Sequence, residues 1–450
     1  MTLSQIRSIW APLAMSWVLM GLELPLVSAV VARLAQPEIH LAAYGGVVFP
    51  LSMLIESPII MLLAAATALA RDGRAYHLIR RFMMISGAAL TALHALLAFT
   101  PLFELVVLTI VKPPPEVVEP ARLGLRLMLP WTWSIAYRRF NHGVMIRDGR
   151  SRFVGLGTLV RLGALASVLT FGLFHRELPG IAVASGAVAF GVLSEAIFAG
   201  VVARPSIRRL RAVPAEGEAL SFARFVAFYT PLALTSLIHL VITPIMAASL
   251  TRMPRPLESL AVWPVVTGIG FTLRSVGIAF NEVVVSTLER PGAPRALRHF
   301  MFRLSGLTFV IHLIMVATPL AGLYFASVSG LAPALAGMAA NAWWLALPAT
   351  CLAVVQSWYT GLLTAHRQTR AIPEAVTLSV VASGLVLAAG IGLQRSLGLY
   401  IGVAGLGLGN LAMLAWLHYR TRSIRAGLRL RDMPPTAARD PRGTVDIPEV

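Results

Sequence analysis

Three carboxylates stand inside long apolar stretches of the sequence, where a charged side chain is costly. Glu23 precedes Pro25 by two residues, Glu56 precedes Pro58 by two, and Glu282 lies in a later apolar stretch. Ionisable residues at membrane depth usually mark an ion path or a cavity, and a proline leaves a backbone carbonyl free to bind a cation. We therefore predict that the three carboxylates bind a coupling ion, either a proton or sodium. The alternative for Glu23 is an ion pair with a neighbouring arginine.

Polar residues at helical spacing form a second set of candidates. Ser52 and Glu56 are four residues apart and share one face of a helix. Arg274 and Asn281 belong to a later stripe of small and polar residues. Arg274 either forms a salt bridge with Glu56 that gates a cavity, or it satisfies local carbonyls while the glycines beside it allow close helix packing.

A cationic group with a histidine suggests anion binding. Ser134, Arg138 and His142 fall on one helix face, Arg139 adjoins them, and Arg161 adds a further positive charge. Guanidinium groups match carboxylate and phosphate geometry. Arginines near the end of a membrane helix can instead extend to the lipid headgroups, and that interpretation fits Arg138 and Arg139 as well.

Thr235, His239 and Thr243 form a third polar line at a spacing of four residues. His239 could titrate near neutral pH and take part in proton coupling, or it could simply bond to a helix carbonyl. The predicted substrate cavity combines residues of all these groups: Pro25, Ser52, Arg138, His142, Thr235, His239, Arg274 and Asn281.

The composition requires that membrane helices position these side chains. Of 450 residues, 57% are hydrophobic and 13% are charged, about half the charged share of a soluble protein. A soluble enzyme is thereby excluded, and the single cysteine, Cys351, excludes a disulfide scaffold. The net charge is +18, but the arginines interrupt apolar runs instead of following one surface, which indicates membrane topology and not nucleic-acid binding.

Twelve apolar stretches are long enough to cross a bilayer, which takes about 20 residues each. We predict an all-α integral membrane protein. The arginines gather in alternate breaks, which predicts that both termini are cytoplasmic. The twelve stretches are 9–33, 41–70, 83–111, 123–146, 154–174, 180–202, 226–251, 259–288, 303–327, 336–364, 373–394 and 400–419.

The chain contains an internal repeat. Pro12 matches Pro231, and Pro25 matches Pro244, at a separation of 219 residues that continues through several arginines and glycines. Each repeat holds six stretches, so the halves should have the same orientation, as parallel six-helix bundles around a central cavity. We predict bundles at 1–202 and 225–420, a cytoplasmic linker at 203–224 and a disordered cytoplasmic tail at 421–450.

These patterns resemble the superfamily that groups multidrug and toxic compound extrusion (MATE) transporters with polysaccharide and lipid-linked-precursor flippases. The resemblance rests on the two six-helix halves, the prolines Pro25 and Pro244, and the pattern RRFNHGVMIRDGRSR from Arg138 to Arg152. The second stretch also looks like bacterial MATE-like proteins and the progressive ankylosis branch. Ion-coupled members usually carry an acidic cluster in one lobe and an Asp in the first helix. Glu23 only approximates that position.

The resemblance implies a secondary active transporter that exports an organic solute by alternating access, in the bacterial inner membrane. Two alternatives stay open: a flippase for a lipid-linked or amphiphilic substrate, and an exporter of organic anions. We expect a monomer without enzymatic activity or a bound cofactor, whose partners are its small-molecule or lipid-like substrate and membrane lipid. His94 and His312 are interpreted as packing residues, and Trp131, Trp133, Trp343 and Trp344 as anchors at the membrane interface.

Overall fold

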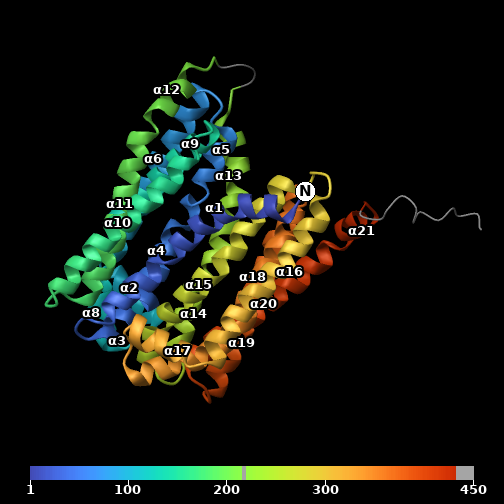
Figure 1. Cartoon of the computed structure of the whole chain (residues 1–450). Coiled ribbons are helices and arrows are strands. Elements are labelled where there is room, and N and C mark those ends of the chain that lie inside the picture. The colour runs from blue at the N-terminus through green and yellow to red at the C-terminus, as the bar shows by residue number, and fades with distance from the viewer. Residues whose placement is uncertain (215–218, 432–450) are drawn as a thin grey trace, which may run out of the picture.

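The structure is a computed structural model, and it describes residues 1–214 and 219–431. Within these ranges every regular element is a helix (Figure 1). The helices up to residue 212 are α1 (Leu3–Gly21), α2 (Glu23–Val31), α3 (Pro37–Ala42), η1 (Ala43–Val48), α4 (Phe49–Glu56), η2 (Ser57–Ile59), α5 (Leu62–Leu69), α6 (Gly73–Phe99), α7 (Leu102–Val106), η3 (Val107–Val111), α8 (Pro115–Leu127), α9 (Leu129–Arg147), α10 (Arg152–Phe174), α11 (Gly180–Val202) and α12 (Arg204–Ala212).

The remaining helices follow in a similar order. They are α13 (Phe222–Leu240), α14 (Ile242–Leu250), α15 (Pro256–Thr287), α16 (Ala293–Ala317), α17 (Leu320–Leu323), η4 (Tyr324–Val328), α18 (Pro333–Ala365), α19 (Ala371–Leu393), α20 (Gly398–Arg420) and α21 (Arg422–Arg431). We call residues 1–214 the N-half and residues 219–431 the C-half.

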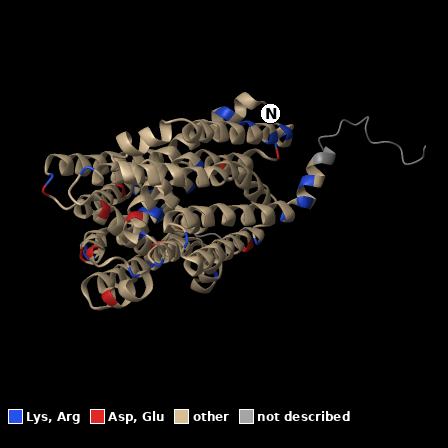
Figure 2. Cartoon of the chain, turned by 90° about the horizontal axis from the view of Figure 1, so that it is seen from below, with Lys and Arg blue, Asp and Glu red and all other residues tan. Residues whose placement is uncertain are grey.

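Eleven helical stretches of the described residues are long and apolar enough to cross a membrane, which indicates a multi-pass membrane protein. Most of the ribbon is accordingly uncharged (Figure 2). The stretch predicted at 123–146 is not among the eleven. It corresponds to the end of α8 and to α9, and α9 carries Arg138, Arg139 and Arg147. α9 can carry these polar residues because its neighbours are other helices and not lipid. Its composition alone therefore does not identify it as a membrane span.

The third and ninth predicted stretches have the wrong bounds. The helix predicted to begin at residue 83 begins at Gly73, where the Asp72 carboxylate accepts a hydrogen bond from the Ala75 amide at 2.9 Å. It ends at Phe99, before Pro101, and a separate short helix follows. In the C-half, α16 likewise ends at Ala317. The arginine-rich first turns resemble loops in the sequence, but they extend the helices beyond the apolar run.

The predicted linker and tail both contain helices. The linker at 203–224 includes α12, and the tail at 421–450 begins with α21; residues 432–450 lie outside the described ranges. Arginines cover both helices, and those of α21 are visible on the helix that leads away from the bundle (Figure 2). The prediction of disorder is therefore wrong for residues 422–431.

Several local features recur in the two halves at nearly the repeat separation. The first long helix of each half is interrupted, at Leu22 and at Val241, and the residues Gln36 and Arg255 both have a left-handed backbone. Each half also contains a fully buried histidine whose Nε2 donates to a backbone carbonyl and whose Nδ1 faces a threonine hydroxyl. The two triads, His94–Thr132–Leu125 and His312–Thr350–Trp343, have Nδ1–Oγ1 distances of 2.9 and 2.7 Å and Nε2–O distances of 3.0 Å in both.

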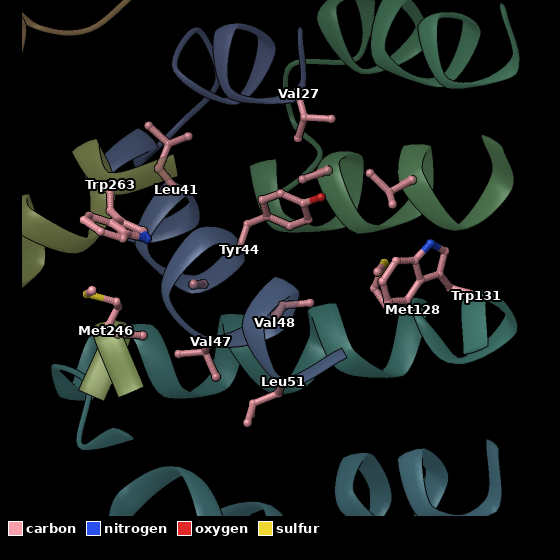
Figure 3. Close-up of a cluster of buried hydrophobic side chains, with 14 of the residues drawn as sticks. Val27, Leu41, Tyr44, Val47, Val48, Leu51, Met128, Trp131, Met246 and Trp263 are labelled. Carbon is pink, nitrogen blue, oxygen red and sulfur yellow. The ribbon is translucent and has the colours of Figure 1, made fainter. Parts of the chain in front are cut away.

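The largest core surrounds the π-helical segment η1 (Figure 3). Tyr44, Val47 and Val48 are buried there, and Gly45 lies so close to Pro264 of α15 that a Cβ would overlap the proline ring. This core therefore joins the N-half to the C-half. Trp131 belongs to it with only 2% of its surface exposed.

The tryptophan prediction is wrong for two of its four residues. Trp131 is buried, and Trp343 is fully buried and stacks on His312 with ring centroids 4.2 Å apart. Trp344 is 48% exposed, as an interface anchor would be. The predicted packing role of His94 and His312 is confirmed, because both rings are completely buried.

The first helix of each half packs on the other half. In α1, the Trp10 indole donates to the Val276 carbonyl at 2.9 Å and lies edge-on to Phe300 at 5.5 Å. In α13, Phe225 and Tyr229 both lie against Phe82 of α6, with centroid distances of 4.8 and 5.0 Å. Both halves are thus tied together by two crossing helices, each with a break in its middle.

Candidate functional site

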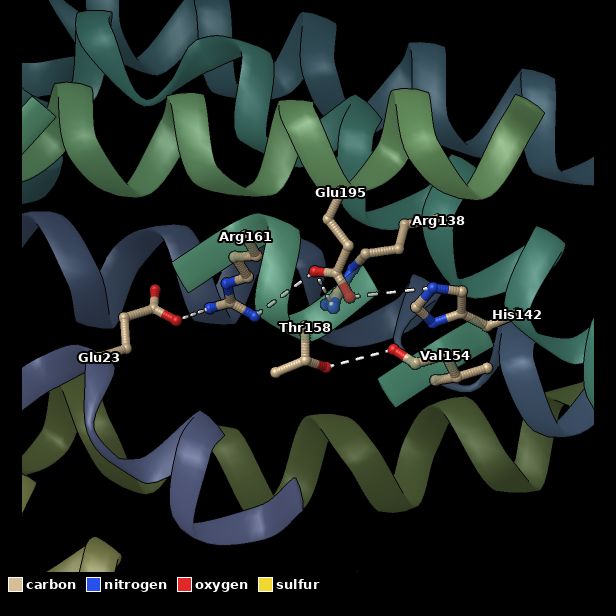
Figure 4. A network of polar contacts seen from close by, with 7 residues as sticks. All are labelled: Glu23, Arg138, His142, Val154, Thr158, Arg161 and Glu195. Atoms are coloured by element: carbon tan, nitrogen blue, oxygen red, sulfur yellow. Dashed lines mark hydrogen bonds and ion pairs between the residues drawn. The ribbon is translucent and has the colours of Figure 1, made fainter. Parts of the chain in front are cut away.

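The N-half brings charged side chains from four helices into one buried cluster (Figure 4). Glu23 begins α2, Arg138 and His142 lie on α9, Arg161 on α10, and Glu195 on α11. Glu195 is completely buried, and Arg138, His142 and Glu23 are each less than 8% exposed. We call these five residues the N-half network.

Glu195 is the centre of the N-half network. Its Oε2 accepts a hydrogen bond from Arg138 Nη1 at 2.7 Å and lies 4.0 Å from Arg161 Nη1. Its Oε1 lies 3.8 Å from His142 Nε2. Arg161 also donates to Glu23, so a continuous chain of contacts runs from α2 to α9. Partnered charges of this kind are the form in which ions are tolerated in a low-dielectric interior.

Two further charged side chains adjoin the network and form no hydrogen bond or ion pair with any described residue. Glu56 is 2% exposed, and its Oε2 has no hydrogen-bond partner; Arg139 Nε is also buried and unpartnered. The guanidinium groups of Arg138, Arg139 and Arg161 lie near enough to the Glu56 carboxylate to act on its charge. Three arginines therefore adjoin three glutamates, and buried polar atoms on both sides lack a hydrogen-bond partner among the described residues.

Local structure explains how the carboxylates reach this depth. The chain ends α1 at Gly21 and restarts at Glu23, which stands in the first turn of α2, where the helix dipole favours a negative charge. Glu56 ends α4 just before the short helix with Pro58. Pro25 packs near Gly268 of α15, while Ser52 is fully buried and its hydroxyl has no partner.

Sequence reasoning missed the central residue. Glu195 is not among the predicted site residues, although it is the sole charged residue between Gly180 and Val202. That isolation was a usable signal, because a lone carboxylate in an apolar membrane helix requires a partner. Arg161 was considered for anion binding only. The predicted alternative for Glu23, an arginine pair, is the arrangement that the structure has.

The C-half contains an open cavity of about 300 Å³ between α1, α15, α18 and α20. Polar side chains line most of it: Arg274, Asn281, Glu282, Gln356, Ser357 and Thr360, with Trp17 from α1. The Trp17 indole donates to Glu282 Oε1 at 3.0 Å, and the Asn281 amide donates to Thr360 at 2.6 Å. Arg274 Nε is buried without a hydrogen-bond partner. We call this space the C-half pocket.

The structure places Arg274 and Glu282 in a different site from Glu56, although the sequence analysis groups them. Among the described residues, Arg274 forms no ion pair with Glu56, because Glu56 faces the N-half arginines and Arg274 lines the C-half pocket. Glu282 is likewise in the pocket wall and not with Glu23 and Glu56. The two predicted groups are thus distinct sites on different halves.

The polar line predicted on the seventh apolar stretch, formed by Thr235, His239 and Thr243, is interrupted. Thr235 and Thr243 lie on different helices, because α13 ends at Leu240 and α14 begins at Ile242. Both hydroxyls donate to their own backbone, to Pro231 at 2.8 Å and Leu240 at 2.8 Å. His239 is exposed, and it is not among the residues that line the C-half pocket.

The described residues contain no group of three or more His, Cys, Asp or Glu side chains able to hold a metal ion.

Comparison with solved structures identifies the fold. The chain is similar to an inward-facing multidrug resistance MATE family transporter of the MOP superfamily, with a TM-score of 0.69 at 14% identity, over 94% of this chain and 100% of the other. It is also similar to an outward-facing MATE family transporter, with a TM-score of 0.61 at 14% identity over 94% and 96% of the two chains. The lipid II flippase MurJ in an inward closed conformation has a TM-score of 0.64 at 12% identity, over 94% and 92%.

No family model matches the sequence. No curated protein matches it either. The fold is thus that of MATE transporters and the MurJ flippase, while the sequence has diverged from theirs.

Proposed function

We propose that the protein is an ion-coupled secondary transporter that exports an organic solute by alternating access. The observation that carries this proposal is the N-half network with the buried Glu56 and Arg139 beside it, which form no hydrogen bond or ion pair among the described residues. Ionisable groups buried at membrane depth are costly, and their usual role is to bind or relay the coupling ion. The fold shared with MATE family transporters supports the same interpretation.

Glu56 is the proposed proton-binding group, and Glu23 and Glu195 hold the arginines in position. When Glu56 is ionised, the three glutamates balance the three arginines around them. A proton on Glu56 leaves the cluster with one excess positive charge and removes the attraction to Arg139. The electrostatic attraction between α4 and α9 then weakens, which is a direct route from proton binding to helix movement. A sodium ion at the same carboxylate is the alternative coupling ion.

The C-half pocket is the proposed substrate site. It offers an unpartnered guanidinium, a carboxylate, two amides and an indole, a set that suits an organic solute with several polar groups. Arg274 would contribute to binding of an organic anion, which is the alternative substrate class. Pro25, Ser52, Arg138 and His142 then belong to the coupling site and not to the substrate cavity.

The two halves are the proposed moving bodies. Their repeated histidine triads and helix breaks support an origin by duplication, with parallel six-helix bundles and an axis along the membrane normal. The TM-score is higher for the inward-facing than for the outward-facing transporter, which supports a cavity open to the cytoplasm. In this proposal the protein is a monomer in the bacterial inner membrane with both termini cytoplasmic.

A lipid flippase is the second candidate, because MurJ is similar over nearly the whole chain. A flippase for a lipid-linked or amphiphilic substrate would use the same alternating halves. The two candidates differ in what the cavity must accept, an intact solute or only the head of a lipid.

Transport into proteoliposomes separates the candidates. Wild-type protein would be reconstituted with an imposed pH or sodium gradient, and ethidium, citrate and a fluorescent phospholipid would be offered in turn. Gradient-driven movement of a soluble probe, lost in Glu56→Gln and retained in the exposed control Glu289→Gln, supports coupled export. Scrambling of the phospholipid alone supports the flippase. Full activity of Glu56→Gln would contradict the proposed coupling site.

A further inference from the structure

The outer face of the N-half carries a groove that neither proposed site uses. It has a volume of about 340 Å³ and lies between α9 and α11, ending at Arg204 where α12 begins. α11 and α12 run along the outer flank of the molecule (Figure 1). Leu193, Ile197 and Val201 on α11 are 36, 60 and 51% exposed, so the apolar rim of the groove faces the lipid.

The opposite wall of the groove is amphipathic. Trp133 and Tyr137 are four residues apart on α9 and therefore lie on one face. Gly200 allows the Tyr137 ring to approach α11, since a Cβ at that position would collide with the phenol. Tryptophan and tyrosine favour the depth at which acyl chains meet headgroups. The groove therefore changes from apolar to polar along its length.

Positive charge is concentrated at the polar end. Arg204 and Arg208 are exposed and are one helical turn apart on α12, and neither forms a hydrogen bond or ion pair with another described residue. The nearby Arg209 differs, because it is paired with Asp148. Ile207 and Leu210 pack against the protein, which fixes α12 in place. Arg204 thus stands at the end of a lipid-facing apolar groove, and Arg208 lies one helical turn further along α12.

We propose that this groove binds one anionic phospholipid. Its phosphate is held by Arg204 and Arg208, and one acyl chain lies against Leu193, Ile197 and Val201. The groove matches both parts of a phospholipid. Guanidinium groups bind the phosphate, and the aliphatic rim takes the place of the lipid chains that would otherwise contact the acyl chain. This site does not depend on the proposed transport function. Its walls are α9 and α11, the two helices that carry Arg138 and Glu195, so a bound lipid would also stabilise the N-half network.

Native mass spectrometry of the purified full-length protein tests the site. Phosphatidylglycerol, phosphatidylcholine and inorganic phosphate serve as probes. Phosphatidylglycerol should bind wild-type protein at least about tenfold more tightly than phosphatidylcholine, and inorganic phosphate should not compete. Arg204→Ala with Arg208→Ala should lose that preference and leave phosphatidylcholine binding unchanged. The matched control, Arg295→Ala with Arg303→Ala, removes two exposed C-half arginines and should keep the preference.

A second variant tests the acyl-chain contact. Ile197→Trp adds bulk at an exposed rim position, so folding is preserved, and binding of both lipids should weaken. Equal binding of the two lipids to wild-type protein, an equal loss in the control, competition by inorganic phosphate, or unchanged lipid binding in Ile197→Trp would each overturn the proposal.

Discussion

The N-half network and the C-half pocket use similar residues in opposite ways. In the network, Arg138 and Arg161 are bonded to Glu195 and Glu23 at buried positions. In the pocket, Arg274 and Glu282 line the same cavity without an ion pair between them, and Glu282 bonds to an indole instead. The N-half network binds most of its charged groups to one another, whereas the C-half pocket presents Arg274 and Glu282 to a ligand.

We propose that this difference separates the coupling site from the substrate site. A buried charge that has a protein partner can be switched by a proton, because the pairing changes when one member is neutralised. An unpartnered guanidinium in an open cavity gains most from a ligand that supplies its partner.

The largest expected effect is the loss of Glu195. Glu195→Gln keeps the shape of the side chain but leaves Arg138 and Arg161 without their shared charge, so it should lower the free energy of unfolding by about 3–5 kcal/mol. The C-half counterpart, Glu282→Gln, should cost less than about 1 kcal/mol because Glu282 is exposed. Thermal unfolding in detergent compares the two. Equal losses of unfolding free energy would mean that the charge of Glu195 contributes no more to stability than that of Glu282.

The pair between Glu23 and Arg161 should show a smaller, coupled effect. Glu23→Gln and Arg161→Gln each break the contact, and the double variant should be more stable than the sum of the single losses predicts, by about 1–3 kcal/mol. The measurement is a double-mutant cycle of unfolding free energies. Strict additivity would show that the two side chains do not interact energetically.

Arg274 should be nearly dispensable for stability, unlike Arg138. Arg274→Ala removes a buried guanidinium nitrogen that has no partner, so the free energy of unfolding should change by less than about 1 kcal/mol or rise. Arg138→Ala should be clearly destabilising, because it leaves Glu195 without its closest partner. A large loss in Arg274→Ala would indicate a partner for Arg274 and contradict the open character of the pocket.

The smallest effect belongs to a pair outside the membrane segments. A hydrogen bond from Arg209 holds the pKa of Asp148 below its ordinary value. Because this pKa is lower in the folded protein, the pair contributes stability above the unfolded pKa of about 3.9, and the contribution is lost as the pH falls through the folded value. Asp148→Asn should therefore be slightly destabilising near neutral pH and indistinguishable from wild type in acid. A loss of stability in Asp148→Asn that grows as the pH falls would contradict this prediction.

The sequence predicts the helical membrane fold well, because apolar length is a local property. It fails where burial is by protein instead of lipid: α9 is polar and lies among other helices, and Trp131 and Trp343 are core residues for the same reason. Helix ends are also misplaced, since arginine-rich turns such as that at Arg74 continue the helix past the apolar run.

The candidate site was only partly predictable. Glu23, Glu56, Arg138 and His142 were recognised as charges in apolar surroundings, and the structure brings them to one place. Their partners could not be assigned, because pairing depends on the packing of α2, α9, α10 and α11. The proposed contact of Arg274 with Glu56 failed for that reason: matching positions in a repeat do not have to face one another.

The central claim is that protonation of Glu56 switches the relative position of the two halves, and distance measurement tests it directly. With Cys351 replaced by Ala, spin labels at Ser151→Cys and Thr369→Cys would sit on exposed loops of the two halves. We expect the wild-type distance distribution to shift between about pH 5.5 and about pH 8, the range of physiological switching. Glu56→Gln should hold the acidic distribution at every pH, and the control Glu289→Gln should follow wild type. A wild-type distribution that ignores pH, or a Glu56→Gln protein that still titrates like wild type, would contradict the claim.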